Sequence, residues 1–103
     1  MSRLSLVTLV VRDYDEAIAF YTGSLGFLLQ EDTILAPDKR WVVVAPANGG
    51  TGLLLAKAKN EAEHAAIGNQ TGGRVFLFIE TDDFDRDHAL MTAKGVTFRE
   101  PPR

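Results

Sequence analysis

The sequence predicts an α+β fold built from two tandem βαβββ modules, of which the second lacks its last two strands. A strand-then-helix pattern occurs twice: displacing the chain by 70 positions places Asp13-Tyr14-Asp15 on Asp83-Phe84-Asp85. Deleting one residue then aligns Gly26-Phe27 with Gly95-Val96. An acidic start, an apolar stripe and a closing glycine recur in the same order, which indicates a duplicated unit. At that offset the counterparts of residues 35–57 fall beyond the last residue, and they include two strands.

The first module is expected to occupy residues 1–57. Residues 4–11 are rich in Leu and Val and too short for a buried helix, so they predict a strand. Asp13 is the expected N-cap of the helix that follows, with Glu16 three positions on as in a capping box, and Gly26 ends that helix. Further strands are predicted over residues 27–31, 40–45 and 53–56, with a hairpin turn at Asn48-Gly49-Gly50.

A polar connector over residues 58–73 is expected to join the two modules, with a short helix over residues 61–66. The incomplete second module, residues 74–103, begins with a predicted strand over residues 75–79, a run of aromatic, Val, Leu and Ile residues. Asp83 then caps a second helix that Gly95 ends. We expect residues 1–103 to form one domain, because about 100 residues is a usual size for a single hydrophobic core.

Composition excludes several classes of function. The chain has no Cys, so it holds no disulfide, thiolate metal site or catalytic cysteine. Its net charge of -3 gives no basic surface for a nucleic acid. The apolar run at residues 4–11 is far too short to span a membrane, and it lacks the flanks of a signal peptide. We therefore expect a cytoplasmic protein that binds neither nucleic acid nor membrane.

Several short motifs point to one family. They are Val11-Arg12-Asp13-Tyr14-Asp15, Phe20-Tyr21, Leu25-Gly26-Phe27 and residues 72–78. Together with the tandem βαβββ pattern, they resemble the vicinal oxygen chelate superfamily, which includes glyoxalase I, bleomycin resistance proteins and extradiol dioxygenases. The resemblance implies a curved mixed sheet with the helices outside and a ligand on the concave face. It specifies the fold better than the reaction, because members share the scaffold and differ in metal, substrate and chemistry.

The resemblance also implies where a catalytic metal would bind. The metal-dependent members place one ligand on the first strand of each module, seven residues before the Asp that starts the helix. Those positions are Leu6 and Phe76 here, and the usual third position, on the last strand of a module, falls in Leu53-Leu54-Leu55. Apolar side chains offer no lone pair to a cation. We therefore expect no catalytic metal, no cofactor and no catalytic residue of that type.

A ligand-binding site is predicted on the inner face of the cup. Strand alternation puts Leu6, Thr8 and Val10 on one wall, and Phe76, Phe78 and Glu80 on the matching wall of the second module. Because buried aromatic residues are more often packing than binding residues, Phe76 and Phe78 are also candidates for the core between the modules. The full set of predicted ligand-binding residues is Leu6, Thr8, Trp41, Val43, Leu54, His64, Asn69, Gln70, Phe76, Phe78 and Glu80.

Three functions stay open at this level. The leading hypothesis is a protein that binds a small apolar or aromatic molecule without a catalytic metal. The first alternative is a metal-dependent lyase of the glyoxalase I type or a dioxygenase. The second alternative is a non-catalytic structural or regulatory homodimer with a filled cup. Either the sequence lacks a C-terminal piece, or another chain covers the strand edges that the incomplete second module leaves, since unpaired edges invite association. We expect a second copy to cover them at least in part, as a homodimer.

Overall fold

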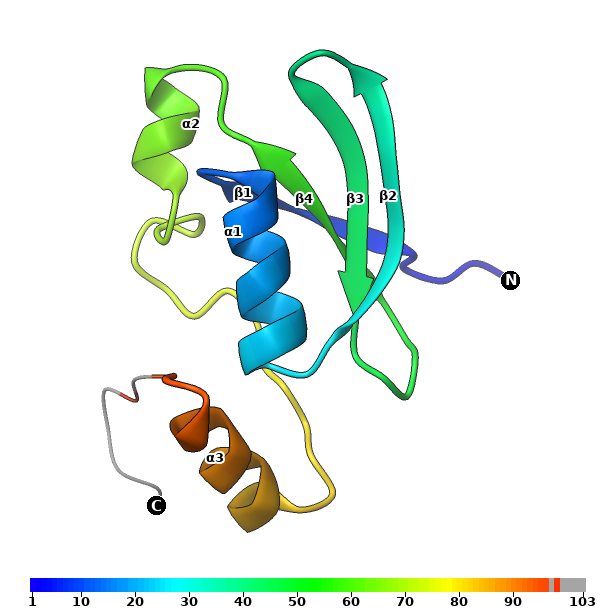
Figure 1. Ribbon diagram of the computed structural model, residues 1–103, viewed down its shortest axis with the longest axis vertical. Helices are drawn as coiled ribbons and strands as arrows, with labels where there is room; N and C mark the ends of the chain where they lie inside the picture. Colours follow the sequence, from blue (N-terminus) through cyan, green and yellow to red (C-terminus); the bar gives the residue numbers. More distant parts are fainter. Residues whose placement is uncertain (97, 99–103) are drawn as a thin grey trace.

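A four-stranded sheet with a helix across one face forms the larger part of the structure, a computed structural model that describes residues 1–96 and 98 (Figure 1). The strand order is β1-β4-β3-β2, with β1 parallel to β4 and the other pairs antiparallel. The elements are β1 (Leu6–Val11), α1 (Tyr14–Ile18), which continues as the π-helix η1 (Ala19–Ser24), β2 (Leu28–Ala36), β3 (Lys39–Ala45), β4 (Gly52–Lys57), α2 (Glu61–Ala66) and α3 (Phe84–Ala93). The α+β class and the curved mixed sheet are confirmed.

The helix boundaries follow the predicted capping residues. The Asp13 carboxylate accepts a hydrogen bond from the Glu16 N–H at 2.8 Å, which satisfies one of the free donors at the start of α1. Asp83 accepts from the Arg86 N–H at 3.0 Å and starts α3 in the same way. Gly26 has φ of 77° just after η1, a conformation that glycine adopts without steric cost.

The core lies between the sheet and the α1–η1 helix. Residues that alternate along each strand supply it, so the remaining residues of each strand point to the opposite face of the sheet. On the core side Val42, Val44 and Leu55 are at most 1% exposed. The other buried members of this cluster are Val11, Tyr14, Ala17, Phe27 and Leu53. This alternation decides which side chains are left for a site on the other face.

The hairpin of β2 and β3 is longer than predicted. β2 runs from Leu28 to Ala36, five residues past the predicted end, and all nine residues are exposed. Its register with β3 shifts between Leu29 and Glu31 and again between Ile34 and Ala36. Backbone pairing with β3 holds this strand, so the hydrophobic pattern did not reveal its length.

The strand predicted over residues 75–79 does not form. Residues 75–80 have no regular secondary structure, and Phe78 is 88% exposed. A strand requires a neighbour that accepts its backbone hydrogen bonds. On the outer edge of β1 the side chain of Gln70 binds backbone groups of Thr8 and Val10, and β propensity by itself does not provide a strand partner. The helix that follows this segment forms as predicted and lies below α1, away from the sheet (Figure 1).

Candidate functional site

Five of the predicted binding residues lie on the sheet face opposite α1. Leu6 and Thr8 come from β1, Leu54 from β4, and Trp41 and Val43 from β3. In the register of the sheet, Thr8 pairs with Leu54 and Leu54 pairs with Val43, so these three side chains form a continuous row across three strands. These five predicted residues therefore share one face of the sheet.

A glycine allows this wall to pack closely. An ideal Cβ placed on Gly52 would lie 3.0 Å from Val43 Cγ1 and 3.1 Å from Leu6 Cδ2. Those distances are shorter than ordinary carbon contacts, so any larger residue at this position would push the two side chains apart. Gly52 thus sets the contact between the β1 and β3 parts of the face.

A cavity of about 630 Å³ opens beside this wall, at the end of the sheet where β1 and β4 finish, and we call it the Trp41 cavity. Trp41 is 36% exposed there. The lining residues are Thr8, Val10, Tyr14, Asp38, Lys39, Arg40, Trp41, Leu54, Leu55, Ala56, Lys57, Lys59, Glu63 and Gln70. The volume lies in the range of cavities that hold a drug-sized molecule, and an apolar wall with a charged mouth is typical of such sites.

Arg40 links the mouth of the Trp41 cavity to the rest of the fold. Its guanidinium donates to Asp32 at 2.7 and 3.1 Å and to Asp15 at 3.0 Å, and it lies 5.2 Å from the centre of the Tyr14 ring. The hydrogen bonds from Arg40 hold the pKa of the Asp32 carboxyl below its usual range. Because its donors are directed at these structural partners, Arg40 ties β3 to β2 and α1.

Gln70 reaches the cavity from the connector and closes part of its wall. Its carboxamide accepts a hydrogen bond from the Val10 N–H at 2.9 Å and donates one to the Thr8 carbonyl at 2.6 Å. The other two predicted connector residues, His64 and Asn69, are exposed and do not line this cavity. Of the three connector residues, the structure therefore brings only Gln70 to the predicted wall.

The three predicted residues of the second module lie elsewhere. Phe76 is partly buried, Phe78 is almost fully exposed, and neither lines the Trp41 cavity. Glu80 lines a second cavity, of about 750 Å³, between the end of η1, the loop after β3 and helix α3. The structure thus does not bring Phe76, Phe78 and Glu80 to the wall formed by β1, β3 and β4.

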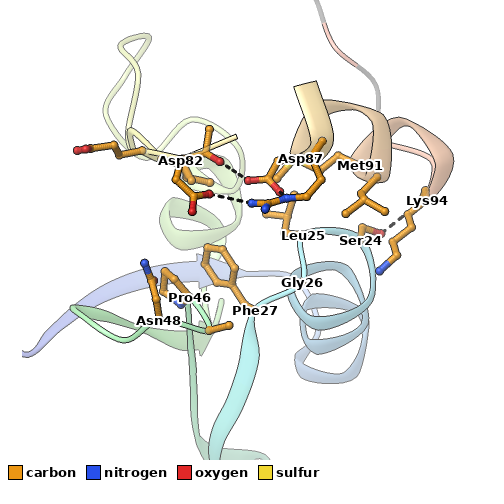
Figure 2. A pocket seen from close by; sticks show the side chains of 16 residues that line it. Ser24, Leu25, Gly26, Phe27, Pro46, Asn48, Asp82, Asp87, Met91 and Lys94 are labelled. Carbon is orange, nitrogen blue, oxygen red and sulfur yellow. Dashed lines mark hydrogen bonds and ion pairs between the residues drawn. The ribbon is translucent and has the colours of Figure 1, made fainter. Parts of the chain in front are cut away.

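Ion pairs at the start of α3 form one side of this second cavity. Figure 2 shows Asp82 and Asp87 across the opening from Pro46. Arg86 binds Asp82 at 2.9 Å and Asp87 at 3.0 Å. The hydrogen bonds from Arg86, and then that from Thr81, lower the pKa of Asp87. Because these charged side chains pair with one another within about one helix turn, they mainly stabilise the N-terminal end of α3.

Sequence reasoning missed several residues that line the Trp41 cavity. Strand alternation had placed Val10 on the wall with Leu6 and Thr8, although it was not among the predicted binding residues. Ala56 alternates with Leu54 on the same face, so the same periodicity could have found it. Tyr14 lines the cavity from the first turn of α1, and no local pattern predicts that placement.

The donor set does not fit a catalytic metal ion. Within residues 1–96 and 98, no three His, Asp or Glu side chains gather closely enough to hold one. Leu6 and the run Leu53-Leu54-Leu55, where the resemblance implies ligands, carry only apolar side chains. We therefore derive no chemical step through a metal.

Comparison with known proteins identifies the family. Residues 3–103 match the family model described as Glyoxalase/Bleomycin resistance protein/Dioxygenase superfamily. An uncharacterized protein of Shewanella frigidimarina (strain NCIMB 400) is 56% identical over 99 residues, which cover 94% of this chain and 73% of that protein.

Two solved structures share the fold. A member of the glyoxalase/bleomycin resistance protein/dioxygenase superfamily from Sphaerobacter thermophilus DSM 20745 is 30% identical with a TM-score of 0.77, and the match covers 100% of this chain and 79% of that one. TnmS3, an antibiotic binding protein from Streptomyces sp. CB03234, is 28% identical with a TM-score of 0.75 over 100% and 78% of the two chains. The chain belongs to the glyoxalase/bleomycin resistance protein/dioxygenase superfamily.

Proposed function

We propose that this protein binds a small apolar or aromatic molecule in the Trp41 cavity and does so without a catalytic metal. The proposal rests on the partly exposed Trp41 side chain, which lines one cavity together with Leu54, Ala56 and Val10. An aromatic ligand buries a large apolar area against such a wall and stacks on the indole ring. The similarity to TnmS3, whose description is antibiotic binding, supports the same class of function.

Charged residues at the rim of the cavity orient a ligand that the apolar wall binds. Lys39, Lys57 and Lys59 and the carboxylates of Asp38 and Glu63 surround the opening. Charged groups at the mouth keep the polar end of a ligand in water while its apolar end is buried. The metal-dependent lyase and dioxygenase alternatives require ligands at positions that this chain fills with leucine and phenylalanine.

A calorimetric titration with aromatic compounds tests the proposal. The chain has a single Trp, so its indole N–H gives one signal in a ¹H–¹⁵N spectrum and reports directly on the cavity. We expect polycyclic aromatic antibiotics and the simple probe methyl 2-naphthoate to bind and to shift this signal. No heat and no shift from any aromatic compound would refute the proposal.

A matched pair of variants locates the binding. Thr8→Arg places a long charged side chain in the cavity and is expected to abolish binding. Thr92→Arg makes the same change at an exposed position of α3, outside the cavity, and is expected to bind as the wild type does. Equal binding by both variants would show that the ligand lies elsewhere.

We further propose that the protein acts as a homodimer in the cytoplasm. The exposed apolar segment supports a second copy as partner, since Val75, Phe78 and Ile79 are 65%, 88% and 52% exposed. A chain without Cys suits a reducing compartment. None of the helices in residues 1–96 is long and apolar enough to cross a membrane. Sedimentation equilibrium tests the dimer, and a monodisperse monomer at micromolar concentration would contradict it.

A further inference from the structure

The carboxamide of Gln70 forms two hydrogen bonds with the backbone of β1. It accepts from the Val10 N–H at 2.9 Å and donates to the Thr8 carbonyl at 2.6 Å, so one planar amide satisfies a backbone donor and a backbone acceptor together. The contact joins residues 60 and 62 positions apart and is not part of a local turn. The bond from Val10 lies within the normal N–H···O range, and the bond to Thr8 is slightly shorter than that range.

The two backbone groups are available because β1 lies at the edge of the sheet. Among residues 1–96 and 98, its only strand neighbour is β4. The odd-numbered residues turn toward β4, since Ser5 and Val11 carbonyls accept from Gly52 and Ala58 N–H groups at 3.0 and 2.9 Å. The N–H and C=O groups of Thr8 and Val10 therefore point away from the sheet. An open edge of this kind pairs with any group that carries an adjacent donor and acceptor.

This hydrogen-bonding pair lies on the wall of the Trp41 cavity. Thr8, Val10 and Gln70 line that cavity together with Leu54 and Trp41. An aromatic molecule held against Trp41 thus lies beside a backbone donor and acceptor whose present partner is a side-chain amide. The cavity thus contains both an apolar surface and a backbone donor and acceptor that an amide satisfies together.

The position of Gln70 in the chain makes its amide replaceable. Gly68 and Gly72 flank it two positions away on either side, with φ of 72° and 78°. Glycine tolerates rotation to either sign of φ, so the segment between them can turn without steric penalty. Gln70 is only partly buried, so its carboxamide can be hydrated when it leaves β1. Exchanging one amide for another leaves no buried polar group unpaired.

We propose that the ligand of the Trp41 cavity carries a primary amide or a lactam, which displaces the Gln70 carboxamide and takes over its hydrogen bonds to Thr8 and Val10. This inference rests on the proposed function and narrows it to aromatic amides. In the unliganded protein Gln70 occupies the site and lowers the apparent affinity in proportion to its occupancy, because only the open fraction binds such a ligand. A ligand without an amide leaves the Gln70 carboxamide bound to β1 and gains no hydrogen bonds to Thr8 and Val10 when Gln70 is removed.

The test compares two aromatic probes, 2-naphthamide and methyl 2-naphthoate, by calorimetry on the wild type and on Gln70→Ala. Two hydrogen bonds of ordinary net strength predict that Gln70→Ala binds 2-naphthamide about tenfold more tightly than the wild type does. Because Gln70 also lines the cavity, methyl 2-naphthoate serves as the reference ligand, and the tenfold gain is expected in the ratio of the amide affinity to the ester affinity. Asn69→Ala is the matched control, because this neighbouring amide is exposed and lies outside the cavity, and it should change neither affinity.

A second measurement does not depend on the fold tolerating Gln70→Ala. In the wild type, 2-naphthamide is expected to shift the side-chain NH₂ signals of Gln70 to those of a solvated amide, whereas methyl 2-naphthoate leaves them unchanged. Equal responses of Gln70 to the two probes, or an unchanged amide-to-ester preference in Gln70→Ala, would overturn the inference and leave the proposed function standing. Binding of neither probe would contradict the proposed function itself.

Discussion

Leu54 and Leu55, adjacent residues of β4, test the assignment of one face of the sheet to the core and the other to the candidate site. Both line the Trp41 cavity, but Leu55 is 1% exposed and belongs to the core cluster under α1, whereas Leu54 lies on the other face and is only partly buried. The same substitution at each position therefore removes the same atoms from two different environments. Leu55→Ala is expected to reduce stability, and Leu54→Ala is expected mainly to weaken ligand binding.

The magnitudes follow from burial. Truncating leucine to alanine removes three carbon atoms, and at about 0.8 kcal/mol for each buried carbon group the transfer contribution is about 2.4 kcal/mol. The cavity left in a well-packed core raises the loss for Leu55→Ala to about 3–4 kcal/mol. At Leu54 part of the side chain is already in contact with water, so we expect a loss of about 1 kcal/mol. A domain of this size is stable by about 5–15 kcal/mol, so Leu55→Ala should stay folded at low temperature.

Urea denaturation followed by circular dichroism measures both values. The slope with denaturant should match the wild type, because neither variant changes the surface exposed on unfolding by much. Calorimetric titration with methyl 2-naphthoate then measures binding under conditions where both variants are folded. Equal stability losses for the two leucines, or a larger loss for Leu54→Ala, would refute the assignment of opposite faces.

Three further predictions concern packing, capping and charge. Gly52→Ala is expected to lower the free energy of unfolding by about 1–3 kcal/mol, because the new Cβ would lie 3.0 Å from Val43 Cγ1; an unchanged urea midpoint would contradict the close contact. Asp13→Ala should lower it by about 1 kcal/mol through loss of the N-cap, again measured with urea. Hydrogen bonds from Arg40 lower the folded-state pKa of Asp32. The ionised Asp32 carboxylate therefore stabilises the folded protein fully above the ordinary aspartate pKa of about 3.9, and this contribution is lost as the pH falls through the lower folded-state pKa. Asp32→Asn should therefore be less stable at pH 7 and lose less stability on acidification, and parallel pH profiles for the two proteins would contradict this linkage.

Most of the first module could be predicted because its signals are local. Asp13 and Gly26 mark the ends of the first helical segment through capping and a left-handed turn, which involve only neighbouring residues. The alternation of Leu53, Leu54 and Leu55 assigns each side chain to a face as soon as the run is known to be a strand. The family also followed from such local motifs, and the match over residues 3–103 confirmed it.

The second module shows where local signals fail. Residues 75–79 have strand-forming side chains and follow the connector as the repeat requires, yet they form no strand in the chain as described. Strand propensity reports how well a side chain fits a sheet and says nothing about which edge is free to receive it. The division into two modules and the binding roles of Phe76, Phe78 and Glu80 stay predictions.

The amino-acid sequence by itself determined the elements of the first module, the face on which Thr8 and Leu54 lie, and the lack of metal donors at Leu6, because periodicity, capping and side-chain chemistry are properties of neighbouring residues. Only the tertiary structure decided that Gln70 closes the edge of β1 and that Trp41 shares a cavity with it. Those contacts join segments about 30 to 60 residues apart in sequence, and their geometry depends on how the connector folds back over the completed sheet.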